Sequence, residues 1–250
     1  MEVEKITPYG DARGKGEQVE EMFDSIAPAY DFMNRAMTLG IDRLWRRRAV
    51  RFIGRTVPAP RHIVDVATGT GDLAIAMARA LPQARITGID LSEGMLAVGR
   101  RKAADAGLDG RISFEKGDGL ALPVVDGSAD VVTIAYGIRN FADIPGGYRS
   151  MFRALRPGGI LVVLELSTPR GFVAGALYRL YTRTLIPLVG RLVSKDSRAY
   201  SYLPESIAAV AQGNAMTALM EQAGFTACSA RAMTFGSCTL YIGKKPDITF

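Results

Sequence analysis

Apolar runs typical of buried strands recur along the chain with helical stretches between them, and this alternation constrains the fold most. The runs cover residues 62–67, 84–92, 111–118, 129–137 and 159–166. Strands joined by helices form a parallel sheet with helices on both faces. We therefore predict an α/β fold with a Rossmann-like, doubly wound, mostly parallel sheet. The final stretch, TACSARAMTFGSCTLYIGKK, predicts an antiparallel C-terminal hairpin at the sheet edge.

Length and composition indicate one domain with additions. The chain has 250 residues, 48% of them hydrophobic, which is enough for one core. We predict a single domain over 1–250, with an N-terminal helical cap at 17–56 and a helical insertion at 171–205. Because Arg179 and Arg183 interrupt its apolar part, the insertion does not predict a membrane-spanning helix. As an amphipathic helix it would rest on an anionic membrane or form a lid on the core, and both interpretations stay open.

Charge and rare residue types narrow the function classes. The net charge of +6 fits either an anionic partner or a solubilising surface. The only histidine, His62, begins an apolar run, which favours a structural role and argues against zinc and Ser-His-Asp hydrolases. Cys228 and Cys238 lack metal-ligand spacing, so we predict no metal site and expect a reducing, cytoplasmic setting.

The stretch HIVDVATGTGD (62–72) predicts a cofactor loop after the first run. Its glycines and Ala74 satisfy G-x-G-x-x-[GA], a pattern that dinucleotide-binding loops also show. Asp65 and Asp72 would repel a diphosphate but attract a cation. S-adenosylmethionine carries a sulfonium and an ammonium and no phosphate. We therefore expect Gly69, Thr70 and Gly71 to receive its methionine part; the alternative is a tight turn capped by Asp72.

Two later acids extend this predicted site. Asp90 ends the second run, where a carboxylate can accept hydrogen bonds from both ribose hydroxyls. Asp118 ends the third, where it can accept from the adenine amine beside the backbone N–H of Gly119. The carboxyl ends of parallel strands share one edge, so these groups should line one crevice together with Asp65. A nicotinamide-binding reductase is the alternative, and Asp72 argues against it.

The fourth run ends in YGIRNF (136–141). If the cofactor is S-adenosylmethionine, this stretch indicates which kind of acceptor receives the methyl group. Methyltransferases that act on base amino groups commonly show Asn/Asp-Pro-Pro-aromatic at this point. The chain also lacks a basic tract interleaved with aromatic residues. We therefore predict no nucleic-acid partner.

Several stretches together resemble the ubiquinone/menaquinone biosynthesis C-methyltransferase family, from about Val19 to Lys245. They are YDFMNRAMTLGIDRLWR (30–46), GIRNF, RPGG, KDSRAYSYLPES (195–206) and the closing FGSCTLYIGKKP. The resemblance implies a class I S-adenosylmethionine-dependent methyltransferase fold, and methyl transfer to a ring carbon of a prenylated quinol. Thr70, Asp90 and the pair Asp118–Gly119 match the family's cofactor positions.

The resemblance also implies an acceptor site. Arg139 and Asn140 match an Arg-Asn pair expected near the reacting ring. This chain has Asp42 where the family usually has His, and Ala135 at a cofactor-side position that is often Ser. A ring carbon becomes nucleophilic when a neighbouring hydroxyl loses its proton, and in-line attack then depends on positioning.

A fixed guanidinium suits the resulting oxyanion. We therefore expect Arg139 to stabilise the quinolate and Asn140 to orient it, with Asp42, Tyr30 or a water as the base. A surface salt bridge is the alternative role for Arg139.

The expected reaction converts demethylmenaquinol to menaquinol, with a benzoquinol acceptor left open. The competing hypotheses are another small-molecule or lipid O- or C-methyltransferase and a non-catalytic complex subunit. A lipid acceptor favours peripheral contact with the inner face of a membrane. Monomer and homo-oligomer are both compatible with the sequence.

Overall fold

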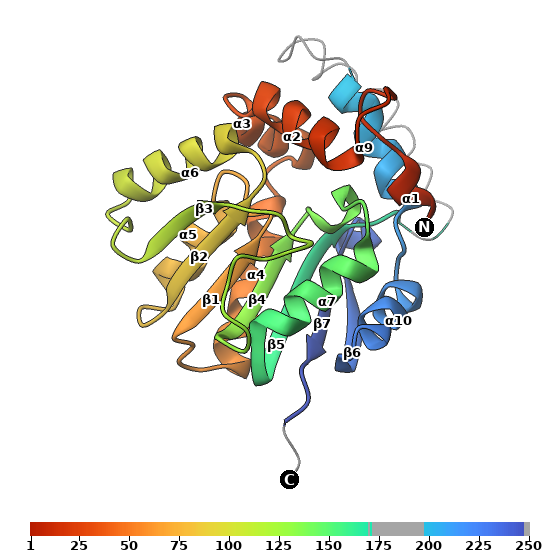
Figure 1. Ribbon diagram of the computed structural model, residues 1–250. Helices are drawn as coiled ribbons and strands as arrows, with labels where there is room; N and C mark the ends of the chain where they lie inside the picture. The colour runs from red at the N-terminus through yellow and green to blue at the C-terminus, as the bar shows by residue number, and fades with distance from the viewer. Residues whose placement is uncertain (170, 172–197, 248–250) are drawn as a thin grey trace.

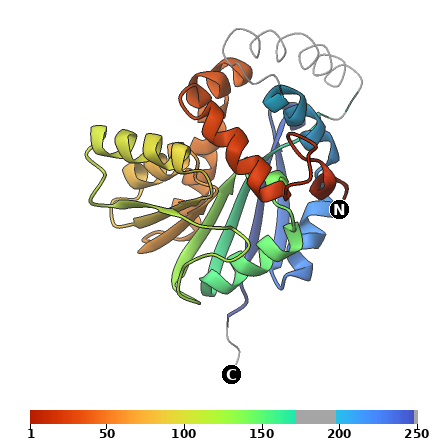
Figure 2. The ribbon, with the colours of Figure 1, turned by 45° about the horizontal axis from the view of Figure 1, so that its top comes forward.

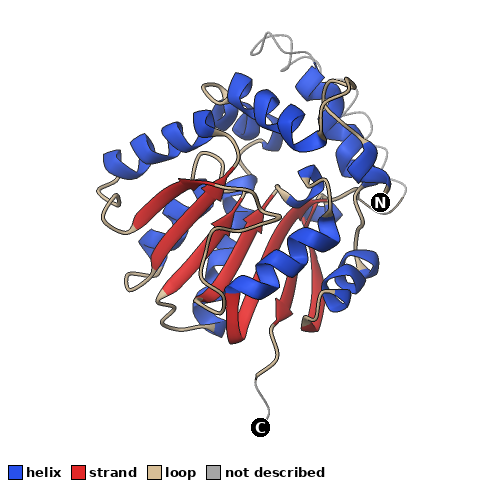
Figure 3. Cartoon of the chain, viewed as in Figure 1, coloured by secondary structure: helices blue, strands red, loops and turns tan. Residues whose placement is uncertain are grey.

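The computed structural model describes residues 1–169, 171 and 198–247, and these form a seven-stranded sheet with helices on both faces (Figure 1, Figure 3). The strand order is β3-β2-β1-β4-β5-β7-β6. Strands β1 to β5 pair in parallel, and β7 is antiparallel to both its neighbours. The doubly wound, mostly parallel sheet is confirmed. The strands are β1 His62–Val66, β2 Arg85–Asp90, β3 Ile112–Lys116, β4 Ala129–Ala135, β5 Leu155–Leu166, β6 Thr226–Met233 and β7 Cys238–Lys244.

The predicted C-terminal hairpin is also present. A short 3-10 turn, η2 (Thr234–Gly236), joins β6 to β7. Strand β7 lies between β5 and β6, and Cys238 is the partner of Leu166. The η2 turn therefore lies at the carboxyl edge of the parallel strands.

Both faces of the sheet are buried because neighbouring residues of each central strand point into different cores. Ile63 and Val131 pack on one face, and Val64 and Val132 on the other; all four are 0% exposed. Such two-sided burial explains why these strands appear as continuous apolar runs. Helices α4, α5 and α6 supply the first core, and α7 and α10 the second. Their bounds are α4 Asp42–Thr56, α5 Asp72–Ala80, α6 Glu93–Asp105, α7 Ile144–Ala154 and α10 Asn214–Gln222.

Local signals set several helix starts. Ser92 caps α6, since its hydroxyl accepts from the backbone N–H of Met95 at 3.1 Å. Asp143 caps α7 by accepting from the N–H of Gly146 at 2.8 Å. These caps hold the loops after β2 and β4 in fixed conformations at the carboxyl edge.

Helices α1 (Glu2–Lys5), α2 (Lys15–Ile26), α3 (Tyr30–Thr38) and α9 (Arg198–Ala209) lie over the carboxyl edge of the sheet (Figure 1, Figure 2). Helices α2, α3 and α9 contribute to a small apolar cluster that is separate from the two sheet cores, whereas Val3 of α1 joins the second core. The buried members of the small cluster are Met22, Ile26, Ala27, Met33, Met95 and Tyr202. We call this set of helices the cap.

The last helix of the predicted 17–56 segment packs differently from the cap. Trp45, Ala49 and Ile53 of α4 join the core on one face of the sheet, so α4 belongs to the sheet layer. Most of the predicted 171–205 insertion, including Arg179 and Arg183, lies outside the described residues. Within the described part of the chain, no helix has both the length and the hydropathy needed to cross a membrane.

Candidate active site

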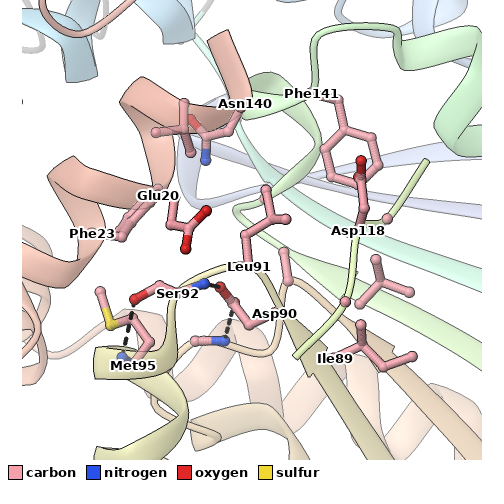
Figure 4. Close-up of a pocket in the computed structure, with 18 of the residues that line it drawn as sticks. Glu20, Phe23, Ile89, Asp90, Leu91, Ser92, Met95, Asp118, Asn140 and Phe141 are labelled. Atoms are coloured by element: carbon pink, nitrogen blue, oxygen red, sulfur yellow. Dashed lines mark hydrogen bonds between the residues drawn. The ribbon is translucent and has the colours of Figure 1, made fainter. Parts of the chain in front are cut away.

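A pocket opens at the carboxyl edge of the sheet, between the strand ends and the cap (Figure 4). It contains about 820 Å³ of space not filled by atoms, part of it open to solvent. The loops after β1 to β4 form its floor and walls, and α2 and α3 cover it. Figure 4 shows Glu20 and Phe23 of α2 on one side, with Asp118 and Phe141 opposite. Of the predicted site residues, the lining includes Tyr30, Gly69, Asp90, Asp118, Gly119 and Asn140.

The glycine loop is fixed to the second strand by Asp90. Its Oδ2 accepts from the backbone N–H of Gly69 at 2.7 Å, and its Oδ1 from that of Ser92 at 3.0 Å. Gly69 and Gly71 have φ values of 57° and 76°, a region that favours glycine. A Cβ on Gly71 would stand 2.7 Å from Phe114 Cζ, so close packing also requires glycine there. Burial raises the pKa of Asp90 to about 6.

Asp118 and Gly119 form the wall beyond the third strand. The Asp118 carboxylate accepts from the N–H of Leu120 at 2.8 Å, which fixes it beside the pocket. A Cβ on Gly119 would lie 2.3 Å from Phe141 Cζ, so the aromatic ring packs directly on this backbone. The wall thus offers a carboxylate, a backbone edge and an aromatic face, which suits a planar base.

Two residues at the adjacent strand ends adopt backbone conformations that side chains disfavour. Ala67 and Tyr136 follow β1 and β4, line the pocket, and have φ values of 48° and 58°. A Cβ on Gly137 would meet Ala67 Cβ at 2.6 Å, so these turns press together. Left-handed non-glycine residues cluster at functional sites. Ala135, where the related family often has Ser, lines the same wall.

Asp65 lies beneath the glycine loop, and the pocket lining does not include it. It is 1% exposed and accepts from the hydroxyls of Thr68 at 2.7 Å and Thr133 at 2.5 Å. Burial raises its pKa to about 6. The side chain therefore supports the loop through Thr68 rather than facing the pocket.

Thr70 and Asp72 belong to an ionic network beside the loop, and neither lines the pocket. The Thr70 hydroxyl donates to Asp31 Oδ1 at 2.6 Å. Lys102 Nζ lies 2.5 Å from both Asp31 Oδ2 and Asp72 Oδ1, and Arg46 lies 2.9 Å from Asp72 Oδ2. Asp31 and Asp42 share these two cations with Asp72, so the network keeps one net negative charge, and the repulsion of a diphosphate by Asp72 stays a prediction.

The pocket lining itself supplies a better charge argument. Glu20, Asp90 and Asp118 line it, and the described lining residues include no lysine or arginine. A diphosphate would meet three carboxylates and no cation, whereas a phosphate-free, positively charged nucleoside suits this wall. The residues present therefore fit S-adenosylmethionine.

At the opposite end of the pocket, Asn140 contacts the cap. Tyr202 of α9 donates from Oη to Asn140 Oδ1 at 3.1 Å, and both side chains are more than nine-tenths buried. Tyr30 of α3 lines the same pocket. Burial raises the pKa of Tyr30, and raises that of Tyr202 to about 12, so both phenols keep their protons at neutral pH. The sequence prediction missed Tyr202, although it lies within the SYLPES stretch.

Arg139 is buried behind this end of the pocket and does not line it. Its Nη1 lies 2.8 Å from Glu165 Oε1 at the end of β5, and it also donates to the carbonyl of Tyr136. Its Nε has no partner in the described structure. A salt bridge does form, but it is buried rather than on the surface. The sequence prediction missed Glu165, although a lone carboxylate within the apolar run 159–166 is a signal, since a buried charge needs a partner.

Two further residues attach the cap near this point. Lys15 Nζ donates to the carbonyls of Val3 at 2.6 Å and Arg139 at 3.1 Å, and burial lowers its pKa to about 8. Asp42 is 2% exposed, pairs with Arg46 at 2.6 Å and accepts from Thr38 at 2.9 Å. Asp42 therefore lies in the ionic network and not at the pocket wall.

Solved structures share this fold. A SAM-dependent methyltransferase of Aquifex aeolicus superposes with a TM-score of 0.59 at 14% identity, covering 81% of this chain and 92% of that one. The [4+2]-cyclase SpnF superposes with a TM-score of 0.62 at 18% identity, covering 93% and 97%. At such identities the likeness concerns the fold alone. Taken with the acid-lined pocket and the matches that follow, it defines an S-adenosylmethionine-dependent methyltransferase.

The chain belongs to the ubiE/COQ5 methyltransferase family, whose model matches residues 11–245. A demethylmenaquinone methyltransferase of Bacteroides fragilis is 47% identical over 242 residues, covering 97% of this chain and 98% of the relative. One from Thermus thermophilus is 44% identical, covering 90% and 100%. A ubiquinone/menaquinone biosynthesis C-methyltransferase of Geobacter sulfurreducens is 45% identical, covering 96% and 93%.

Proposed function

We propose that this protein transfers a methyl group to a ring carbon of a prenylated quinol and converts demethylmenaquinol to menaquinol. The observation that carries the proposal is the near full-length match to relatives named for this reaction. Those matches include the α9 stretch whose Tyr202 contacts the pocket residue Asn140.

The cofactor half of the site follows from the wall residues. Asp90 would accept from the ribose hydroxyls, and Asp118 and the Gly119 backbone would recognise adenine between apolar neighbours. Gly69, Thr70 and Gly71 would shape the loop around the methionine part, with Asp65 supporting the loop from below. Bound S-adenosylmethionine supplies an electrophilic methyl group.

The acceptor half uses groups at the Asn140 end. Asn140, oriented by Tyr202, would hold a quinol oxygen, and Tyr30 would donate a hydrogen bond to the oxyanion that forms. A phenol with a raised pKa is a donor rather than a base at neutral pH, so we assign proton removal to a water in the pocket. Asp42 is less suited to this role because Arg46 and Thr38 already engage its carboxylate.

Arg139 would act through position and charge. Its ion pair with Glu165 and its bond to the Tyr136 carbonyl fix the turn that carries Asn140. Its positive charge also faces the Tyr30 and Tyr202 phenols, where it favours negative charge. We therefore propose Arg139 as a positioning residue rather than a direct ligand of the quinolate.

A prenylated acceptor resides in a bilayer. The proposed function therefore includes work at the inner face of a membrane as a peripheral protein.

The test is an assay of the purified protein with S-adenosylmethionine and a reduced, short-chain demethylmenaquinol, analysed by mass spectrometry. We expect a product heavier by one methylene, and none when the ring is kept oxidised. A parallel reaction with a benzoquinol tests acceptor choice. Methylation of the oxidised ring, or no product with either quinol despite cofactor binding, would contradict the proposal.

Asn140→Ala separates the two halves of the site. Removing the amide should lower kcat by about a hundredfold, because the quinol loses its orientation. The dissociation constant for S-adenosylmethionine, measured by calorimetry, should change less than threefold. Tyr202→Phe, which keeps the ring but not the 3.1 Å bond to Asn140, should lower kcat by about fivefold. Equal losses of affinity and turnover in Asn140→Ala would remove this residue from the acceptor site.

A further inference from the structure

Large apolar side chains are exposed on the cap side of the molecule. Phe32 is 62% exposed, Leu39 75%, Leu44 45% and Phe235 87%. Phe32 and exposed Arg35 stand three residues apart on one face of α3, and Leu39 directly follows Thr38, the last residue of this helix. Scattered apolar side chains need no explanation, but apolar residues gathered on one surface do.

Two of these residues sit in turns whose backbone disfavours them. Leu39 ends α3 with φ 51°, and Phe235 lies in η2 with φ 56°. Glycine or asparagine ordinarily occupies such positions, because a bulky side chain in the left-handed region is strained. In both turns the strained residue points a large apolar group at solvent. These side chains neither pack in the core nor favour the backbone conformation of their turns. Their presence therefore indicates a contact with a partner outside the chain.

One hydrogen bond links η2 to the helix that follows the Leu39 turn. Trp45 Nε1 donates to Thr234 Oγ1 at 2.8 Å, joining the first turn of α4 to the residue before Phe235. Leu44 precedes this tryptophan, and the α3–α4 turn with Leu39 precedes Leu44. Because Cys238 pairs with Leu166 at the end of β5, this surface is at the carboxyl edge, where the pocket also opens.

Arginines surround the apolar side chains. Arg43 and Arg47 flank Leu44 on α4 and are exposed, as is Arg35 on α3. None of the three forms an ion pair within 4.0 Å in the described part of the chain. Apolar side chains among arginines match an anionic bilayer, whose headgroups attract the cations while the acyl boundary receives the apolar groups. A protein partner of ordinary composition would not require this clustering of one charge.

We propose that the surface formed by Phe32, Leu39, Leu44 and Phe235 with Arg35, Arg43 and Arg47 docks on an anionic phospholipid bilayer. We call it the docking surface. Docking there would hold the pocket edge against the membrane that contains the acceptor. The inference rests on the proposed function for its purpose, but it is tested without the acceptor.

The first test uses the full chain and flotation with vesicles of phosphatidylcholine and phosphatidylglycerol. We expect the wild type to bind these vesicles and to bind pure phosphatidylcholine at least about tenfold more weakly. The double variant Leu39→Asn, Phe235→Asn should bind the anionic vesicles at least about tenfold more weakly than the wild type. Asparagine tolerates the left-handed region, so this variant should unfold at a urea concentration no lower than the wild type.

Val125→Asn is the matched control. Val125 is 76% exposed but lies in the loop before β4, at the opposite edge of the sheet. Its substitution should leave vesicle binding unchanged. A loss equal to that of the double variant would overturn the proposal, because any exposed apolar residue would then contribute.

A second test concerns charge. Arg43→Ser and Arg47→Ser should each weaken binding to the anionic vesicles by about fivefold. Arg85→Ser, an exposed arginine at the start of β2, is the control and should have little effect. Raising the salt concentration should weaken wild-type binding and narrow these differences.

The outcomes separate this inference from the proposed function. Unchanged vesicle binding by the double variant overturns the docking surface. A second result would also overturn it: the wild type does not bind vesicles but self-associates, and the double variant is monomeric. The surface would then join two copies of this chain. Activity on a short-chain quinol in solution should be equal in wild type and double variant. If that activity is absent while vesicle binding behaves as expected, the proposed function fails and the docking surface stands.

Discussion

The sheet body and the cap are held together by different forces. In the body, strand and helix side chains such as Leu161, Val163 and Tyr148 are 0% exposed in continuous apolar cores. The cap has one small apolar cluster and is attached largely by polar contacts. Lys102 pairs with Asp31, Lys116 with Glu20, and Ser92 bonds Asp24.

This difference indicates that the body provides the stability of the fold and that the cap responds to binding. Apolar burial is non-directional and gives the body its stability without reference to the cofactor. The cap contacts are directional, and several of them lie beside pocket residues. Binding in the pocket should therefore order the cap, while the body stays folded whether or not the cap is closed.

The largest expected effect is on the body. Leu161→Ala should lower the free energy of unfolding by about 3 kcal/mol, because it leaves a cavity in a close-packed core. Met22→Ala, an equally apolar change in the cap cluster, should cost about 1 kcal/mol or less, since the cap can open locally. Urea unfolding followed by Trp45, the single tryptophan, measures the body. Equal losses of unfolding free energy in the two variants would contradict the difference between body and cap.

The next prediction concerns the carboxylate of Asp65, which is buried inside the body beneath the glycine loop. Its pKa in the folded protein is about 6, above its value in the unfolded chain. The folded state therefore binds the proton more tightly, and the stability of the wild type relative to Asp65→Asn should fall as pH rises from about 4 to about 6. The fall should be on the order of 2 kcal/mol.

The measurement is urea unfolding of both proteins at several pH values without cofactor. Asp109→Asn, in an exposed loop, is the control and should show no such pH dependence relative to the wild type. If the difference in unfolding free energy between the wild type and Asp65→Asn is constant from pH 4 to 6, then burial does not raise the pKa of the Asp65 carboxylate.

A smaller effect is expected from the ionic network of the cap. Lys102→Met removes the cation between Asp31 and Asp72 and the contact with Thr70. The affinity for S-adenosylmethionine should fall about tenfold, because Asp31 and Asp72 then lose their shared cation and only the Thr70–Asp31 hydrogen bond still joins α3 to the glycine loop. Lys116→Met also breaks a cap-to-body pair, but that pair is 53% and 31% exposed, so its effect should stay under about twofold. Calorimetry that gave equal changes for the two variants would mean that the network does not organise the pocket.

The sequence predicted the body better than the contacts between body and cap. Apolar runs and glycine stops follow from local chemistry, and Asp90 and Asp118 fall on the pocket wall because strand ends share an edge. The roles of Asp72 and Arg139 depend on partners far along the chain. Arg46 and Lys102 pair with the first, and the second is buried in an ion pair with Glu165. No local pattern reveals such pairings.

The place of β7 in the sheet has a consequence for synthesis on the ribosome. Residues 167–237 lie between β5 and β7, so the free edge of β5 stays unpaired while they are made. At about 5–20 residues per second, this takes roughly 4 to 14 s. Strand β6 is made before β7, but in the folded sheet β7 lies between β6 and β5. The nascent chain thus carries an open, apolar strand edge until its last strand emerges, and this is the interval in which a chaperone would matter most.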